Sequence, residues 1–569
     1  MDRLTTLREA MKRHEIDAYI MVNCDPHESE YLPDHWKSVR WITGFRGEVA
    51  TVIVTHDEAL LWTDSRFFIS GEQQLQGTGI KLMKMKIDMT ATDWMKEKLK
   101  AGNGDWKIGA DLKILFGPLA EFVNTDTDLM EEIWTDRPEM PLDKVEIYAD
   151  EYNGESAEEK IGRTLKAIEE QAAEGQETSL LISALDEIAW MLNLRGNDIH
   201  CTPVFTSYLL LSAKERILYV DDRKLTDEVV KYLENLNIVT QPYEEGLKLA
   251  KEHKNTVKNP IPLMKGIKNQ VEIDGFRNAM LKDGIAMTQF YHWLETELPS
   301  GKITEMQCVG KLREYRERQP LYKDESFDAI VAWNEHGALP HYEPTEETDV
   351  EIKGDGLLLI DTGGHYLDGT TDITRTIGVG NVSKAMKRDY TLVLKGHIRL
   401  AQAVFPEGTR GDQLDALARM DLWRDGKTYR HGTSHGVGHY LGVHEGPESV
   451  RMEHNPQQLL PGMFFSNEPA IYLGGKYGIR HENCVLVREF DPQTEAPEAS
   501  PCCQEEHGRF LCLETLTLCY IDTRCIDINL MDRNEIDWVN RYNRHVCNCL
   551  TPHLDADDAN WLAAKCKEI

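Results

Sequence analysis

The chain has 569 residues, of which 41% are hydrophobic and 28% charged, an ordinary composition for a globular protein with room for three or four domains. Its formal net charge of -32 at pH 7 repels phosphate backbones and anionic lipid, so neither nucleic acid nor a membrane is expected as a partner. The opening stretch has no apolar signal core, and no run reaches the ~18 apolar residues that span a bilayer. We therefore expect a cytoplasmic protein.

The first part of the chain alternates predicted helices and strands. MDRLTTLREAMKRHEIDAYIMV predicts an amphipathic helix followed by a strand. GEVATVIVTHDEALLWTDSRFF predicts two strands joined by a polar turn from His56 to Glu58. The stretch 136–156 mixes proline, glycine and acidic residues, which indicates a domain boundary.

A second α/β unit follows this boundary. EKIGRTLKAIEEQAAEG predicts a helix, TSLLISA a strand, LDEIAWMLNLRG a helix that ends at Gly196, and YLLLSA with RILYVDD a pair of strands. Prolines near 259–266 indicate a second boundary, after which KNQVEIDGFRNAMLKDGIAMTQFYHWLETEL predicts one long helix. The stretch 491–508 lacks periodicity, so we expect a surface loop there.

Most of the twelve cysteines lie after residue 500, namely Cys502, Cys503, Cys512, Cys519, Cys525, Cys547, Cys549 and Cys566. No CxxC pair occurs among them, which argues against a zinc site with that spacing. A disulfide framework is not expected without a secretion signal. We interpret them as reduced thiols that mostly pack, with a redox role as the alternative.

Two predicted hairpins concentrate acidic residues. In GLLLIDTGGHYLDGTTDITRTIGVG, residues 356–380, one strand ends in Asp361 and a second strand contains Asp372. A turn with Asp368 joins these strands. Pairing of the strands therefore brings Asp361 and Asp372 together.

GMFFSNEPAIYLGGKYGIRHENCVLV, residues 462–487, predicts a second hairpin, with Glu468 at the end of one strand and Glu482 within the next. Carboxylates in apolar strands are costly to bury unpaired, and like charges oppose one another. Two divalent cations would resolve both costs. Oxygen-rich ligation favours manganese, with zinc or cobalt as alternatives, and two such ions about 3.5–4 Å apart can hold a hydroxide nucleophile.

The stretch HGTSHGVGHYLGVHEG, from His431 to Gly446, contains four histidines. His431 and His435 have the spacing of metal ligands on a helix. The frequent glycines make a helix unfavourable, so we expect an extended or looped segment that crosses a site built elsewhere.

These motifs resemble a known family. IDTGG and GTTDITRT, HGTSHGVGHYLGVHEGP, and NEPAIY with GIRHEN are similar to aminopeptidase P, a metallopeptidase family with the pita-bread fold that is related to prolidase, creatinase and methionine aminopeptidase. DPHESEYLPDHWKSVRWITGF, LDEIAWMLNLRGNDIHCTPVF and EIDWVNRYNRHV extend the resemblance over nearly the whole chain.

The resemblance implies an α/β (α+β) fold in three parts. Two N-terminal creatinase-like α/β domains would span 1–155 and 156–263. A catalytic pita-bread domain would span 264–569, with a C-terminal extension from about 505 to 569. The resemblance also implies a homodimer formed through the last domain.

The resemblance also implies roles for particular residues. Asp361 would chelate one metal ion, Asp372 and Glu482 would bridge two, and His435 and Glu468 would hold the other. Glu468 would in addition accept a proton from the hydroxide.

The family's substrate-binding residues have counterparts here as well. Three histidines would contact substrate or stabilise the tetrahedral intermediate, and two neighbours of the metal ligands would contact substrate or product: His341, His431, His444, Tyr472 and Arg480. His439 occupies a position where the family requires no histidine.

The resemblance implies hydrolysis of an N-terminal Xaa-Pro bond, with release of the first residue from peptides that have proline second. Prolidase, which cleaves only dipeptides with the same ligands, is the nearest alternative. A non-catalytic pita-bread binding protein is the other, although such proteins typically lose metal ligands and all five are present here.

Overall fold

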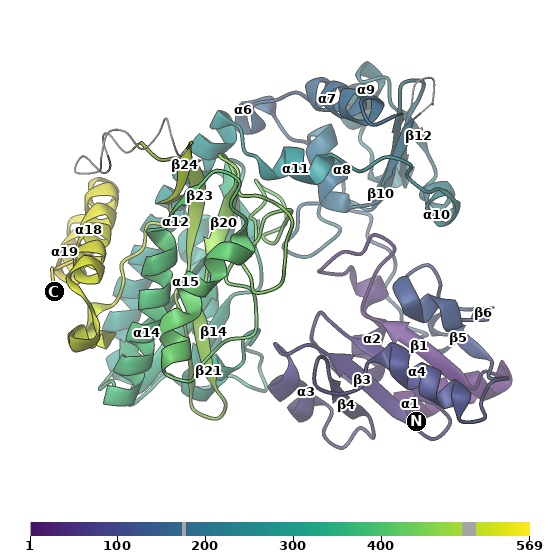
Figure 1. Ribbon diagram of the computed structural model, residues 1–569, viewed down its shortest axis with the longest axis horizontal. Helices are drawn as coiled ribbons and strands as arrows, with labels where there is room; N and C mark the ends of the chain where they lie inside the picture. The colour runs from purple at the N-terminus through teal and green to yellow at the C-terminus, as the bar shows by residue number, and fades with distance from the viewer. Residues whose placement is uncertain (1, 173–177, 492–494, 496–507) are drawn as a thin grey trace. The chain divides into compact units, whose positions relative to one another are not determined.

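The computed structural model describes residues 2–172, 178–491, 495 and 508–569, so most of the predicted loop at 491–508, with Cys502 and Cys503, lies outside the described residues. The chain forms two compact units (Figure 1). Unit 1 consists of Met1–Ile147 and Ala157–Asn259, and unit 2 of Tyr148–Ser156 and Pro260–Ile569. Within the described ranges no helix is long and apolar enough to cross a membrane.

The first part of unit 1 is a six-stranded sheet in the order β4-β3-β2-β1-β5-β6. Its strands are β1 (Ala18–Val22), β2 (Thr51–Thr55), β3 (Ala59–Thr63), β4 (Lys81–Lys84), β5 (Ile108–Ala110) and β6 (Thr125–Asp126). Its helices are α1 (Arg3–Arg13), α2 (Ser38–Thr43), α3 (Phe68–Gln74), α4 (Ala91–Lys100) and α5 (Met130–Ile133). The predicted first helix and strand, and the antiparallel pair β2–β3 with its polar turn, are confirmed.

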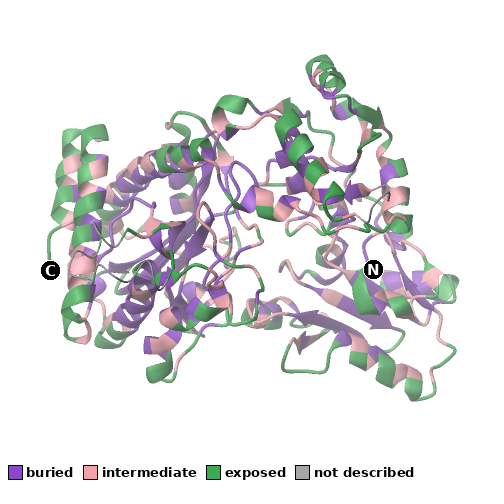
Figure 2. Ribbon diagram, turned by 45° about the horizontal axis from the view of Figure 1, so that its top comes forward, coloured by how far each residue is buried: buried purple, intermediate pink, exposed green. Residues whose placement is uncertain are grey.

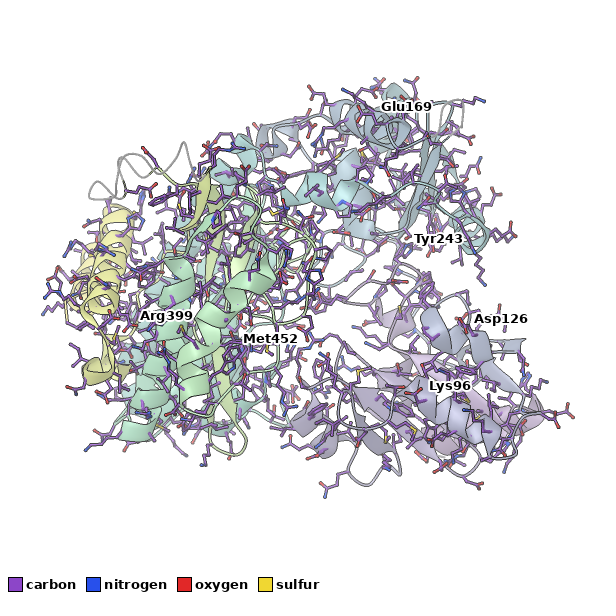
Figure 3. The ribbon with its side chains drawn as sticks, viewed as in Figure 1. Lys96, Asp126, Glu169, Tyr243, Arg399 and Met452 are labelled. Atoms are coloured by element: carbon purple, nitrogen blue, oxygen red, sulfur yellow. The ribbon has the colours of Figure 1, made fainter. Side chains whose placement is uncertain are left out.

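Helix α1 shows why the opening sequence folds as predicted. Leu4, Leu7, Ala10 and Met11 recur at helical spacing, and all four are buried in the core beside β1 and β2. The charged side chain of Lys96, labelled on α4, is by contrast exposed (Figure 3).

The second part of unit 1 is a four-stranded sheet in the order β12-β11-β10-β8. Its strands are β8 (Ser179–Ile182), β10 (Ser207–Ser212), β11 (Arg216–Val220) and β12 (Val239–Gln241), and a separate pair joins β7 (Glu146–Ile147) to β9 (Leu194–Arg195). Its helices are α7 (Ala157–Glu169), α8 (Leu185–Leu192), α9 (Asp227–Asn235) and α10 (Tyr243–Glu252).

The predicted end of α8 at Gly196 is wrong. The helix ends at Leu192 because Asn193 adopts the left-handed conformation, with φ 47° and ψ 45°, which asparagine tolerates better than most residues. The side-chain oxygen of Asn193 accepts a hydrogen bond of 2.7 Å from the Nζ of the buried Lys160. Leu194 and Arg195 then pair with β7 as a short strand.

Unit 2 combines short sheets with long helices. Its strands are β13 (Tyr322–Glu325), β14 (Ile330–Trp333), β15 (Gly356–Thr362), β16 (Gly364–Tyr366), β17 (Gly369–Thr370), β18 (Ile373–Val379), β19 (Val404–Pro406), β20 (Phe464–Asn467), β21 (Ala470–Leu473), β22 (Tyr477–Arg480), β23 (Asn483–Glu489) and β24 (Phe510–Thr515). Its helices are α6 (Asp150–Asn153), α11 (Ile261–Gly266), α12 (Gln270–Glu297), α13 (Glu305–Glu317), α14 (Lys384–Ala401), α15 (Gly411–Arg424), α18 (Arg533–Leu550) and α19 (Ala556–Lys565).

The sheets β14-β15-β18 and β19-β24-β23-β20 carry the acidic hairpins, and α12 confirms the predicted long helix. Helix α12 begins with a capping box, in which the side chains of Asn269 and Glu272 bond each other's backbone N–H groups. Helices α14 and α15 lie side by side, as do α18 and α19 at the C-terminus (Figure 1).

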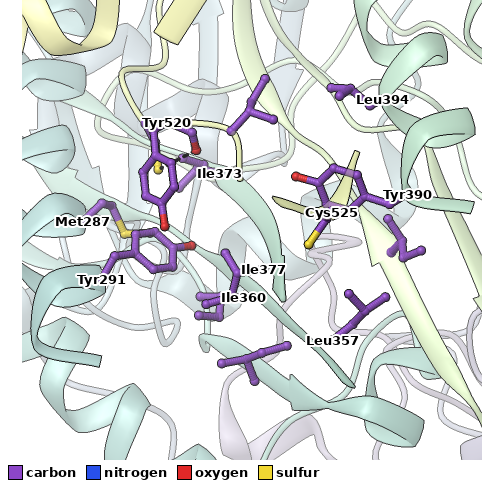
Figure 4. Packing of buried hydrophobic residues seen from close by; sticks show 14 of the residues in the cluster. Met287, Tyr291, Leu357, Ile360, Ile373, Ile377, Tyr390, Leu394, Tyr520 and Cys525 are labelled. Atoms are coloured by element: carbon purple, nitrogen blue, oxygen red, sulfur yellow. Dashed lines mark hydrogen bonds between the residues drawn. The ribbon is translucent and has the colours of Figure 1, made fainter. Parts of the chain in front are cut away.

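Strands β15 and β18 are buried along their whole length, because both faces of their sheet are covered (Figure 2). On one face the labelled Ile360, Ile373 and Ile377 pack with Tyr291 of α12 and Tyr390 of α14 (Figure 4). Polar side chains on these two strands are therefore shielded from solvent, and each needs a hydrogen-bond partner within the protein.

Candidate metal centre

The first hairpin brings its two aspartates together. Asp361 belongs to β15 and pairs with Thr374 across the ladder, while Asp372 comes directly before β18 rather than within it. The small strands β16 and β17 are inserted between them, and Asp368 lies in their turn, as predicted. Carboxylate oxygens of Asp361, Asp372 and Glu482 all lie within 4.8 Å of one another.

The second pair of acids is joined by the hairpin β21–β22, which belongs to a different sheet from the flanking strands β20 and β23. Glu468 directly follows β20, as predicted. The prediction that Glu482 lies within a strand is wrong: it occupies the break between β22, which pairs with β21, and β23, which pairs with β20. The chain changes sheets at this point, so the Glu482 amide bonds outside its own hairpin and donates to the carbonyl of Thr374 at 3.0 Å.

The histidine-rich segment is not a helix, which confirms the prediction from its glycines. Two hydrogen bonds hold it to β20: the His435 amide donates to the side-chain Oγ of Ser466 at 3.1 Å, and the Ser466 amide donates to the His435 carbonyl at 2.9 Å. Gly436 forms bridges to both Glu445 and Phe465, and a Cβ at Gly436 would lie 2.8 Å from the Glu445 carbonyl. Close backbone approach therefore fixes the position of His435.

The imidazole of His435 is oriented for ligation. Its Nδ1 lies 2.9 Å from the carbonyl of Gly436, which accepts an N–H, so Nε2 faces the carboxylates. Nε2 is 3.4 Å from Oδ2 of Asp372 and 3.6 Å from Oε1 of Glu468. Burial lowers the pKa of His435, but these two carboxylates outweigh it and raise the pKa to about 9.

The buried carboxylates create a need for positive charge. Burial, followed by the charges of Asp372, Asp361 and Glu468, raises the pKa of Glu482 well above its ordinary value. Burial likewise raises the pKa of Asp361, whose Oδ1 meets no hydrogen-bond partner in the described part of the chain. Four acids and one oriented imidazole at these separations fit a pair of divalent cations.

A chain of hydrogen bonds leads from the acids to His431. Arg480 donates from Nε to Asp361 at 3.1 Å and from Nη1 to the Tyr472 hydroxyl at 2.5 Å. That hydroxyl can then donate to Nε2 of His431, 3.0 Å away, while Nδ1 of His431 faces the Gly432 carbonyl at 2.7 Å. Burial, and next the charge of Arg480, lowers the pKa of His431 well below its ordinary value. The structure thus presents His431 as a neutral imidazole.

The remaining predicted histidines divide into two groups. His444 offers a nitrogen within 4.8 Å of ligand atoms of Asp372 and His435, and His341 is near enough for its charge to act on His431. His439 lies apart from them: Nδ1 is 3.2 Å from the Tyr148 hydroxyl. Its ring also meets Phe276 edge-on. The structure therefore gathers the five predicted ligands with His431, His444, Tyr472 and Arg480, and it leaves His439 outside this group.

Sequence reasoning missed the residues that support the acids. Thr374 donates from Oγ1 to Oε2 of Glu482 at 2.7 Å and accepts from Nε of Arg480 at 3.1 Å. Arg375, next along β18, donates to the Glu482 carbonyl. The signal was present in TTDITRT, because polar side chains in a strand covered on both faces must bond within the protein.

Comparisons with known proteins agree with this geometry. Residues 274–489 match metallopeptidase family M24, and residues 509–569 match the C-terminal region of peptidase M24. Residues 3–122 and 136–258 each match a creatinase/prolidase N-terminal domain. The fold and the site thus define a metallopeptidase with creatinase-type N-terminal domains, which confirms the predicted fold class.

Relatives that match over the full length of the chain identify the family within this class of metallopeptidases. A probable Xaa-Pro aminopeptidase P of Laccaria bicolor is 36% identical over 100% of this chain and 93% of its own length. A probable Xaa-Pro aminopeptidase P of Sordaria macrospora is 35% identical, and the match covers 99% of this chain and 98% of that protein. The chain belongs to the Xaa-Pro aminopeptidase P family. The solved X-prolyl aminopeptidase of Caenorhabditis elegans, described as a cytosolic enzyme with a di-nuclear active site, is 33% identical with a TM-score of 0.90 and covers 100% of this chain and 99% of its own.

Proposed function

We propose that this protein removes the first residue from peptides with proline in second place, by metal-dependent hydrolysis of the Xaa-Pro bond. The observation that supports this most strongly is the convergence of Asp361, Asp372, His435, Glu468 and Glu482 within overlapping groups whose ligand atoms lie within 4.8 Å. Family membership and the names of the full-length relatives support the substrate class.

Two divalent ions would occupy the site. Asp361, Asp372 and Glu482 form one group, and His435, Glu468 and Glu482 form another, which supports Glu482 as the ligand that both ions share. When bound, the ions would supply an activated water and polarise the scissile carbonyl. The oxygen-rich donor set favours manganese, with zinc or cobalt as alternatives. The di-nuclear site of the C. elegans enzyme supports the number of ions.

The side chains of this chain perform the proton transfers. Glu468 accepts the proton of the attacking water and passes it to the proline nitrogen, which must be protonated to leave. The scissile Xaa-Pro bond has no N–H that an enzyme could bind. We therefore expect the enzyme to recognise this bond through its carbonyl oxygen. His444 and His341 would donate hydrogen bonds to that oxygen as it becomes negative. His431, Tyr472 and Arg480 would orient the peptide and stabilise Asp361.

Substrate length tests this function against the prolidase alternative. Metal-loaded protein is incubated with Arg-Pro-Pro, Arg-Ala-Pro and Gly-Pro, and the released amino acids are quantified by mass spectrometry. We expect release of arginine from Arg-Pro-Pro alone. Cleavage of Gly-Pro without cleavage of Arg-Pro-Pro would identify a dipeptidase, and no cleavage together with no bound metal would favour a binding protein.

The setting of the enzyme belongs to the same proposal. A cytoplasmic location is supported by the description of the C. elegans enzyme as cytosolic. The net charge of -32 supports peptide partners over nucleic acid or membranes. Domains at 1–155, 156–263 and 264–569 with an extension from about 505, and a homodimer through the last domain, rest on the family resemblance. Light scattering of the purified protein tests the dimer.

A further inference from the structure

We propose that the C-terminal region fixes the bridging ligand Glu482 through Arg375, and that Arg375 and Tyr542 are positioning residues for the metal centre. This inference rests on the proposed role of Glu482 as a metal ligand. It concerns a guanidinium on the opposite side of β18 from the carboxylates.

Arg375 is fully buried, and its acceptors among the described residues are all neutral groups. Its relative exposure is 1%, and its side chain reaches six acceptors: the carbonyls of Thr374, Glu482, Cys519 and Tyr520, the side-chain oxygen of Asn483 and the hydroxyl of Tyr542. These acceptors serve all three nitrogens, so the five N–H groups are satisfied without a carboxylate. A buried cation without a paired anion is costly, which indicates that its geometry has a purpose beyond stability.

The strand alternation explains how Arg375 reaches the centre from behind. Side chains at alternate positions of β18 face opposite ways, so Arg375 shares a face with Ile373 and Ile377, which pack in the core (Figure 4). Thr374 faces the other way and donates to the Glu482 carboxylate at 2.7 Å. Two consecutive residues of one strand therefore hold Glu482 from two sides.

Glu482 depends on these contacts because no strand holds it. It lies in the break between β22 and β23, where ladder hydrogen bonds do not fix its backbone. Its amide donates to the Thr374 carbonyl at 3.0 Å, and its carbonyl accepts from Nη1 of Arg375 at 2.6 Å. Without the second contact the peptide plane of Glu482 could rotate, and the carboxylate would lose its position between the two ions.

The C-terminal region holds Arg375 in turn. The carbonyls of Cys519 and Tyr520 belong to an irregular stretch after β24, and they accept from Arg375 at 2.8 and 3.1 Å. Tyr542 of α18 places its hydroxyl 2.8 Å from Nη2 of Arg375, and this hydroxyl also bonds Asn483 at 3.2 Å. Residues 509–569, the region that matches the C-terminal part of peptidase M24, thus bond directly to the support of the metal ligand.

The inference is tested by titrating the metal-stripped full-length protein with Mn2+ and measuring free Mn2+ by electron paramagnetic resonance. Outer-shell changes typically weaken metal binding by about 10–100-fold. We expect Arg375→Lys to weaken the more labile ion within that range, and Tyr542→Phe, which removes a single hydroxyl, by roughly 3–10-fold. Tyr542→Phe decides alone if Arg375→Lys does not fold.

Tyr390→Phe is the matched control. Its buried hydroxyl also bonds the C-terminal region, at the Asp522 carbonyl 3.0 Å away, but it is not among the six acceptors of Arg375 and forms no hydrogen bond with Glu482 in the described part of the chain. It should leave Mn2+ affinity unchanged even if the unfolding temperature falls. Parental Mn2+ affinity in folded Tyr542→Phe would overturn the inference. Because binding is measured without substrate, two bound ions without peptide cleavage would refute the proposed function and leave this inference standing.

Discussion

Replacement of the shared acid, Glu482→Gln, tests whether the carboxylate that binds the ions also destabilises the protein when no ion is bound. Glutamine keeps the shape of the side chain and an oxygen that can accept from Thr374, but it removes one negative charge from the cluster. Asp361, Asp372 and Glu482 place oxygens within 4.8 Å of one another. At that distance, and with an effective dielectric constant of ~20, two unit charges repel by about 3.5 kcal/mol.

Glu482 faces three such neighbours, because Glu468 also places an oxygen within 4.8 Å of it, so at that separation the repulsion in the metal-stripped protein sums to about 10 kcal/mol. Proton uptake and the charge of Arg480 offset most of this, and we expect the metal-stripped variant to be about 1–3 kcal/mol more stable than the parent. With metal at 1,000 times the dissociation constant the parent gains about 4 kcal/mol per ion, which the variant loses. The order of stability should therefore reverse between chelator and metal.

Thermal unfolding in EDTA and in Mn2+ measures this reversal, and elemental analysis reports the bound ions. In EDTA the variant should unfold at a temperature equal to or a few degrees above the parent. In Mn2+ the parent should unfold at the higher temperature, and only the parent should cleave peptide. An equal metal-induced shift in both proteins, or a variant several degrees less stable in EDTA, would refute the reasoning.

Three further substitutions test particular side chains. Tyr472→Phe removes the hydroxyl between Arg480 and His431, so turnover should fall about tenfold with metal content unchanged. His439→Ala removes a buried ring beside the Tyr148 hydroxyl, and should cost about 1–3 kcal/mol of stability while turnover per folded molecule stays at the parental rate. Burial, and next the charge of Glu445, raises the pKa of Glu448 from 4.5 to about 7, so parental stability should fall as pH rises through this window. Glu448→Gln should match the parent near pH 4.5 and exceed it by about 3 kcal/mol at pH 8.

Each of these predictions has a contradicting result. Loss of bound metal in Tyr472→Phe would place the hydroxyl in ligand support rather than in histidine orientation. A large fall in turnover for folded His439→Ala would give that histidine a catalytic part. A stability difference for Glu448→Gln that is the same at both pH values would show that the carboxylate does not titrate between them.

Local patterns were sufficient to predict much of the fold. The period of apolar residues predicted α1 and α12, and the two apolar runs on either side of the polar turn at His56 predicted β2 and β3. The end of α8 was missed because the left-handed conformation of Asn193 is stabilised by Lys160, a residue on a different helix. A single sequence shows helix periodicity, but it does not show which distant side chain will meet a helix end.

Only part of the candidate site could likewise be predicted from the sequence. The acids and His435 stand in recognisable motifs, and the structure places them together. The position of Glu482 outside a strand, and its bonds to Thr374 and Arg375, depend on how two sheets meet. The acceptors of Arg375 include backbone carbonyls of a distant segment, and carbonyls carry no sequence signature.

The central claim is that two ions held by the five predicted ligands make this chain an Xaa-Pro aminopeptidase. The most direct measurement follows arginine release from Arg-Pro-Pro while metal-stripped protein is titrated with Mn2+ and bound metal is counted. We expect no release of arginine without metal, and a rate that reaches its maximum as the second ion binds. Full turnover in protein that elemental analysis shows to be free of metal would contradict it.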